Sequence, residues 1–290
     1  MKFLPVILFL ILAVVVSLQD IPGSFNFSGT SGKIKHPNGQ GSYSLQDKTP
    51  NKYKSDAYSS SFTNAYYSGS YTELQKYLDN IASSHIKPFD WTTVKEPYLY
   101  VKYVYQIFED FYTPKNLSRI GFSSYRGNFY SDLKYALIQD HIDVKICDSI
   151  TGNIFEKKYF MNLSIQDFRP NVKIPGTKVI YLDEWLKRGI MNFLDNPFIT
   201  TGNDTIISIE QAIAEREKKL NFLNKYLMIF RAGMRRYWVI ETYPVLDIFF
   251  NRDFSKARVD FMLDCEGGEA YYERTGNKWN LVKAGVSWIE

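Results

Sequence analysis

The chain has 290 residues, which is enough for one or two domains with a substantial buried core. Its hydrophobic fraction of 45% and charged fraction of 23% are those of a folded globular protein. The 35 basic and 31 acidic residues leave a net charge of only +4. Nucleic-acid-binding proteins usually show a clustered basic face, so this even balance argues against a nucleic-acid partner.

The N-terminus carries an apolar run from Phe3 to Val16 behind a single basic residue, Lys2. The run has the length of a signal-peptide core and is shorter than the roughly 20 residues that a membrane span needs. Residues 1–19 are therefore predicted to be a signal peptide cleaved after Ser17 or an uncleaved N-terminal anchor. Both alternatives predict an exported protein (secreted, periplasmic or membrane-anchored and facing outward) that meets the membrane through this segment alone.

Three further regions follow in the predicted organisation. Residues 20–70 are dense in Gly, Ser, Asn and Lys and poor in aliphatic side chains, so we expect a flexible lead-in. Residues 71–200 are typical of an α+β region, and residues 201–290 of a helix followed by an antiparallel sheet. The predicted fold class is α+β.

Apolar spacing predicts the elements of the region 71–200. Helices are expected over residues 71–84, 97–112 and 128–140. Alternating apolar residues on both sides of a turn then predict a strand hairpin over residues 141–165. Asp183 is the expected N-cap of a short helix that ends before Pro197.

The last region begins with a long amphipathic helix. Ser208 and Gln211 have the spacing of a capping box, and the apolar stripe that follows predicts a helix up to about Gly233. Short β runs separated by turn-forming residues then predict a four- or five-stranded antiparallel meander.

Residues 205–290 resemble the nuclear transport factor 2-like and cystatin-like superfold. The similarity lies in the closing strands, where a hydrophobic strand leads to "GGEA" (267–270) and then to "KWNLVKAGVSW" (278–288). The resemblance implies a long amphipathic helix packed on a curved antiparallel β-meander. Enzymes of this superfold generally transfer protons from a concave pocket, which would make Asp247 the candidate inward-pointing base.

The last strands show two patterns of side-chain alternation. Ala257, Val259 and Phe261 share one face, together with Leu263 and Cys265, and we expect this face to meet the helix. The strand that starts at Trp279 carries apolar residues of both parities. It is therefore predicted to be covered on both sides, by the region 71–200 or by a dimer partner.

The C-terminal region also holds the candidate ligand-binding residues. They are Tyr237, Trp238, Tyr243, Asp247, Tyr272, Trp279 and Trp288. Such a set could line a groove for a small molecule or a peptide. Aromatic residues on strands more often pair across the sheet and fill the core, and we favour that structural interpretation.

The sequence contains few motifs that indicate a chemical activity. No nucleophile elbow, metal-binding motif or cofactor loop occurs, and the three His residues are scattered, so no catalytic residue, metal or cofactor is predicted. Cys147 and Cys265 could form a disulfide in an exported chain, although a buried thiol at Cys265 is slightly favoured.

The leading hypothesis is an exported, non-catalytic binding or interaction protein for a small molecule, a peptide or a protein. The alternative is an isomerase-like or hydrolase-like enzyme that uses a carboxylate in a cone-shaped pocket. A homodimer formed through the sheet is a third interpretation.

Overall fold

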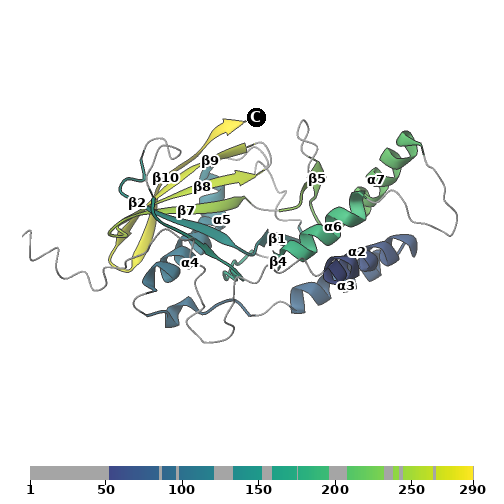
Figure 1. The fold of residues 1–290 in the computed structure, drawn as a ribbon, viewed down its shortest axis with the longest axis horizontal. Coiled ribbons are helices and arrows are strands. Elements are labelled where there is room, and N and C mark those ends of the chain that lie inside the picture. Colours follow the sequence, from purple (N-terminus) through teal and green to yellow (C-terminus); the bar gives the residue numbers. More distant parts are fainter. Residues whose placement is uncertain are drawn as a thin grey trace, which may run out of the picture. The chain divides into compact units, whose positions relative to one another are not determined.

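The computed structural model describes residues 52–84, 87–95, 98–120, 133–151, 159–174, 176–195, 208–231, 238–241, 244–263 and 266–289, all within the unit Lys33–Glu290 (Figure 1). The helices are α2 (Lys52–Tyr67), α3 (Tyr71–Ser84), the short 3₁₀ helix η1 (Trp91–Thr93), α4 (Leu99–Phe111), α5 (Pro114–Ile120), α6 (Glu184–Asp195) and α7 (Ile209–Leu223). The strands are β1 (Tyr135–Gln139), β2 (Ile142–Cys147), β3 (Tyr159–Ile165), β4 (Lys178–Leu182), β5 (Phe230–Arg231), β6 (Trp238–Val239), β7 (Val245–Asn251), β8 (Lys256–Leu263), β9 (Glu266–Thr275) and β10 (Lys278–Ile289). The fold is α+β, as predicted, and no helix in the described ranges is long and apolar enough to cross a membrane.

The main sheet has six strands in the order β10-β9-β8-β7-β2-β3 (Figure 1). Strands β7 to β10 form the predicted antiparallel meander. The predicted hairpin β2–β3 joins it through a parallel pairing of β2 with β7. The predicted regions 71–200 and 201–290 therefore contribute strands to one sheet.

Helix α4 covers one face of the main sheet. Its side chains are buried on most sides, and Val104, Ile107 and Phe108 share a core with Val144 of β2 and Val259 of β8. Helices α4 and α5 both contact β10. The helix that packs on the meander is thus α4 and not the one that begins after Ser208. We call the side of the sheet under α4 the core face and the opposite side the outer face.

A second core lies among α2, α3, α6 and α7 and a parallel pair of strands, β1 and β4. The predicted helix over 128–140 is wrong for residues 135–139, which form β1, while residues 128–132 lie outside the described residues. All five residues of β1 are buried, and a short strand buried on both sides reads as a continuous apolar run. Periodicity alone does not separate such a run from a helix.

Helix α2 occupies the last part of the segment that was predicted to be a flexible lead-in. It orders because Phe62 and Ala65 are buried in the second core, where the Phe62 ring contacts those of Tyr77 and Phe193. Helix α6 also approaches α2 very closely. A Cβ at Gly189 of α6 would lie 2.4 Å from the Tyr58 Cβ, so only glycine fits this contact.

Helix α7 begins where it was predicted to begin and ends earlier. The Ser208 side chain accepts from the Gln211 backbone N–H, which completes the capping box. The helix stops at Leu223 instead of about Gly233. The reason is local, because the Asn224 side chain binds both the N–H and the carbonyl oxygen of Ile229 and turns the chain away.

A bulge in strand β10 explains why apolar residues of both parities occur along it. Its register with β9 shifts between Leu281 and Lys283, so Val282 is an extra residue. Such a bulge switches the parity of the residues that follow it. Leu281 before the bulge and Ala284 and Val286 after it therefore all pack on the first core. One covered face therefore accounts for both parities among these residues, and cover of the other face by a dimer partner stays a prediction.

Candidate functional site

The structure does not bring the predicted ligand-binding residues together. Tyr272 and Trp279 are buried in the first core, whereas Trp238 is buried in the second. Asp247 lies on the outer face of the sheet, in register with Asp143 and Asp260. Tyr237 and Tyr243 lie outside the described residues, as does the side chain of Trp288, whose backbone pairs with β9.

The buried aromatic residues of this set fill the cores. The Trp279 ring contacts the rings of Tyr103 and Phe250. The phenol of Tyr272 is fully buried, and burial together with the nearby carboxylate of Asp110 raises its pKa well above the ordinary value. These contacts agree with the structural interpretation of the aromatic set.

The outer face of the sheet carries a row of four carboxylates. Register pairs place Asp143, Asp247, Asp260 and Glu269 side by side on β2, β7, β8 and β9. Burial raises the pKa of Asp247, and repulsion from Asp143 adds to the effect. Burial also raises the pKa of Asp260, although the neighbouring Arg258 opposes the shift. Like charges directly opposite each other destabilise a sheet, so this row requires compensation.

Two cations of the outer face supply that compensation. Arg258 is buried and places its guanidinium 2.6 Å from both Asp260 and Glu269. Lys145 lies 3.5 Å from Asp247. Three of the four acids, Asp247, Asp260 and Glu269, are thus paired within the sheet itself. In the described part of the chain no group of three or more His, Cys, Asp or Glu residues could hold a metal ion.

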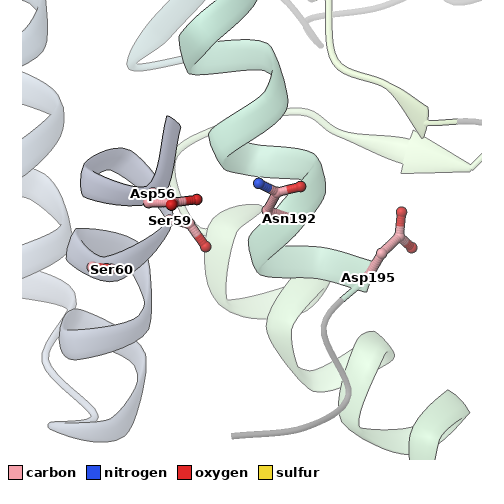
Figure 2. A pocket seen from close by; sticks show the side chains of 5 residues that line it. All are labelled: Asp56, Ser59, Ser60, Asn192 and Asp195. Atoms are coloured by element: carbon pink, nitrogen blue, oxygen red, sulfur yellow. The ribbon is translucent and has the colours of Figure 1, made fainter. Parts of the chain in front are cut away.

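An open surface pocket of about 460 Å³, which we call the cavity, lies between α2 and α6 and is broadly exposed to solvent (Figure 2). Its volume is in the range of small-molecule sites. The lining side chains are all polar: Asp56, Ser59 and Ser60 from α2, and Asn192 and Asp195 from α6. In Figure 2 the amide of Asn192 points toward Asp56 and Ser59 across the space between the helices.

Two residues outside the cavity lining contact the carboxylate of Asp195. The Trp238 indole N–H donates to its carboxylate over 3.0 Å, and Arg216 of α7 lies 3.4 Å from the same oxygen. Trp238 was predicted to touch a ligand, but here it positions a cavity residue. A hydrogen bond to an ionised group is stronger than a neutral one, so the Trp238 contact orients Asp195, and the nearby guanidinium of Arg216 adds electrostatic attraction.

Asp56 on the opposite wall has no cation within 4.0 Å among the described residues. Its carboxylate oxygens accept only, whereas the hydroxyls of Ser59 and Ser60 and the amide of Asn192 both donate and accept. The cavity therefore suits a ligand that donates several hydrogen bonds and carries positive charge.

The sequence prediction missed this cavity because its first wall falls within the supposed lead-in. One signal was present in the sequence. Tyr58, Phe62 and Ala65 recur at helical spacing, and Phe62 and Ala65 are the buried apolar residues in the described part of α2. Such a weak stripe is informative only when a partner helix is known.

Only one of the two cysteines of the predicted disulfide lies among the described residues. Cys147 is buried at the end of β2, beside Phe249 on the outer face. Cys265 lies outside the described residues. The pairing of the two cysteines stays a prediction.

No protein-family model matches the chain, and no curated protein matches it. The functional argument therefore depends on the geometry of the cavity and of the outer face.

Proposed function

We propose that this protein is an exported, non-catalytic binding protein that holds a small polar molecule in the cavity between α2 and α6. The observation that carries the proposal is the polar lining, in which two aspartates, two serines and one asparagine border an open pocket of about 460 Å³. The apolar N-terminal run supports export.

The contacts of Asp195 fit a binding role. One carboxylate oxygen accepts from the Trp238 indole N–H and lies 3.4 Å from Arg216. Among the described residues both contacts use this same oxygen, which leaves the other oxygen to accept a hydrogen bond from a ligand.

The alternative of a carboxylate enzyme finds less support. Asp247 lies on the outer face, away from α4, and the core face beneath α4 is filled by buried rings such as Phe108, Phe111 and Phe250. A cone-shaped pocket beside α4 with Asp247 at its bottom does not fit this arrangement. The superfold resemblance of residues 205–290 stays a prediction, because the helix that packs on the meander is α4, which lies outside those residues.

The ligand class follows from the donors and acceptors of the cavity. An ammonium group would neutralise Asp56, which lacks a cationic partner in the described ranges. Hydroxyl groups would bond to Ser59, Ser60 and Asn192. We therefore propose a small molecule that carries both amino and hydroxyl groups, and we choose glucosamine as a probe of this chemistry.

Isothermal titration calorimetry of the full chain with glucosamine tests the proposal, and glucose serves as the uncharged counterpart. We expect glucosamine to bind more tightly than glucose. The substitution Asp56→Asn keeps the shape of the side chain and removes its charge. It should weaken glucosamine binding by about ten- to a hundredfold, since a charge-assisted hydrogen bond contributes about 1.5–3 kcal/mol.

The matched control is Glu273→Gln, which removes an exposed acid paired with Lys256 on the main sheet. It should leave the affinity for glucosamine unchanged. Equal binding by Asp56→Asn and the wild type, or no heat change with either sugar at millimolar concentration, would contradict the proposed site.

A further inference from the structure

The two edge strands of the main sheet differ in their protection against pairing. Strand β10 carries Lys278 and Lys283 and has two register shifts. Charged residues and bulges are the devices by which natural sheets block the addition of another strand. Strand β3, with the sequence YFMNLSI, has no charged residue and no proline. Within the described residues it pairs only with β2.

The side chains of β3 are also incompletely covered. Phe160 is 49% exposed, and Asn162 is exposed on the outer face. On the core face, Met161 and Ile165 are only partly buried against the first core. The register shift of the β2–β3 pair lies at the Phe160 end of β3, so residues 161–165 form a regular edge.

We propose that a second copy of this chain adds to this edge, with the two β3 strands antiparallel about a two-fold axis at Leu163. Met161 then lies opposite Ile165 of the partner subunit, so that apolar residues meet on the core face. Asn162 lies opposite Ser164 of the partner subunit, so that polar residues meet on the outer face. The backbone groups at the outer edge of β3 gain hydrogen-bond partners, as in strand addition generally.

The charges on β2 favour this register over its neighbour. On the outer face, Lys145 stands beside Asn162, and Asp143 stands beside Ser164. With the axis at Leu163, Lys145 and the partner's Asp143 lie in the same row of side chains across the two joined sheets. An axis at Asn162 would instead align Lys145 with its own copy. Opposite charges in one row favour the first arrangement, although their separation of roughly three strand spacings limits the effect.

The expected dimer is weak. Five paired residues bury less surface than the roughly 1,200 Å² that stable specific interfaces reach. We therefore expect a dissociation constant in the micromolar range, about 1–100 μM. Analytical ultracentrifugation of the full chain over a concentration series measures this equilibrium directly.

Two double variants test the register. Asn162→Lys with Ser164→Lys places only positive charges about the axis and should weaken the dimer at least about tenfold. Asn162→Lys with Ser164→Glu places Lys opposite Glu in both pairs and should keep the dimer or tighten it. Circular dichroism and thermal unfolding of both variants check that the monomer fold is retained.

The other edge supplies the control. Val282 of β10 is 54% exposed, and Val282→Lys should leave the dissociation constant unchanged. A wild-type chain that stays monomeric up to about 200 μM overturns the proposal. Equal weakening by both double variants, or dissociation caused by Val282→Lys, also overturns it. The cavity lies on other elements, so glucosamine binding by these variants is expected to be unchanged.

Discussion

Arg258 is the residue on which the outer face of the sheet depends most. Its side chain is only 8% exposed, and it pairs with Asp260 and Glu269, which lie directly opposite each other on β8 and β9. Without the guanidinium, these two carboxylates would face one another with no cation between them. Breaking a buried ion pair by removing one partner leaves uncompensated charge, which is costly.

The substitution Arg258→Met should lower the free energy of unfolding by about 2–3 kcal/mol at pH 7. Burial already raises the pKa of Asp260, and loss of Arg258 would raise that pKa further. A carboxyl whose pKa is higher in the folded state than in the unfolded state costs stability as the pH rises through that interval. The deficit should therefore shrink toward pH 4, as urea unfolding at both pH values would reveal.

Lys145→Met is the matched control, because Lys145 pairs with a more exposed partner on the same face. An ion pair of this kind contributes only about 0–1 kcal/mol. A loss for Arg258→Met that is no larger than for Lys145→Met, or that is the same at pH 4 and pH 7, would contradict the assigned role of Arg258.

At the scale of elements, the contact between α2 and α6 determines the shape of the cavity. Gly189 allows the helices to touch, since an added Cβ would meet the Tyr58 Cβ at 2.4 Å and the Ser55 carbonyl oxygen at 3.2 Å. Neither atom lies at the end of a flexible side chain, so the helix axes themselves would have to move apart.

The substitution Gly189→Ala should therefore destabilise the protein by about 1–3 kcal/mol, although alanine favours helices over glycine by about 1 kcal/mol. Thermal unfolding measures the change. Gly285→Ala on β10 is the control, because its added Cβ would meet nothing within 4 Å. A Gly189→Ala variant as stable as the wild type would show that α2 and α6 do not pack as described.

The elements that could be predicted are those specified by local signals. Asp183 caps α6 by accepting from the Leu186 N–H, and the capping box of Ser208 starts α7 where the sequence places it. The two-sided burial of β1 depends on neighbours distant in sequence, and the bulge at Val282 depends on the register of β10 against β9. Local spacing carries no information about such contacts, which is why neither the strand β1 nor the bulge was predicted.

The candidate site could be predicted even less well. Trp238 and Asp247 were named from their positions in the C-terminal region, and the structure places them on different elements with different roles. The cavity is lined by both Asp56 and Asp195, which lie far apart in the sequence, and no motif links them. Only the packing of α2 against α6 brings them together.

At the scale of the whole chain, two hydrophobic cores combine elements that lie far apart in the sequence. The first combines α4 with strands from β2 to β10, and the second combines α2 with α6, α7 and β6. Helix α2 is therefore part of the folded protein, although its residues fall within the predicted flexible lead-in. The proposed binding function depends on this point, because α2 supplies three of the five residues that line the cavity.

Hydrogen-exchange mass spectrometry of the full chain tests this claim most directly, through peptides that cover residues 55–65 of α2. We predict protection comparable to that of α6, since both helices are buried in the same core and exchange requires its opening. Exchange of these peptides at the rate of an unfolded chain, while β7 to β9 stay protected, would contradict the account.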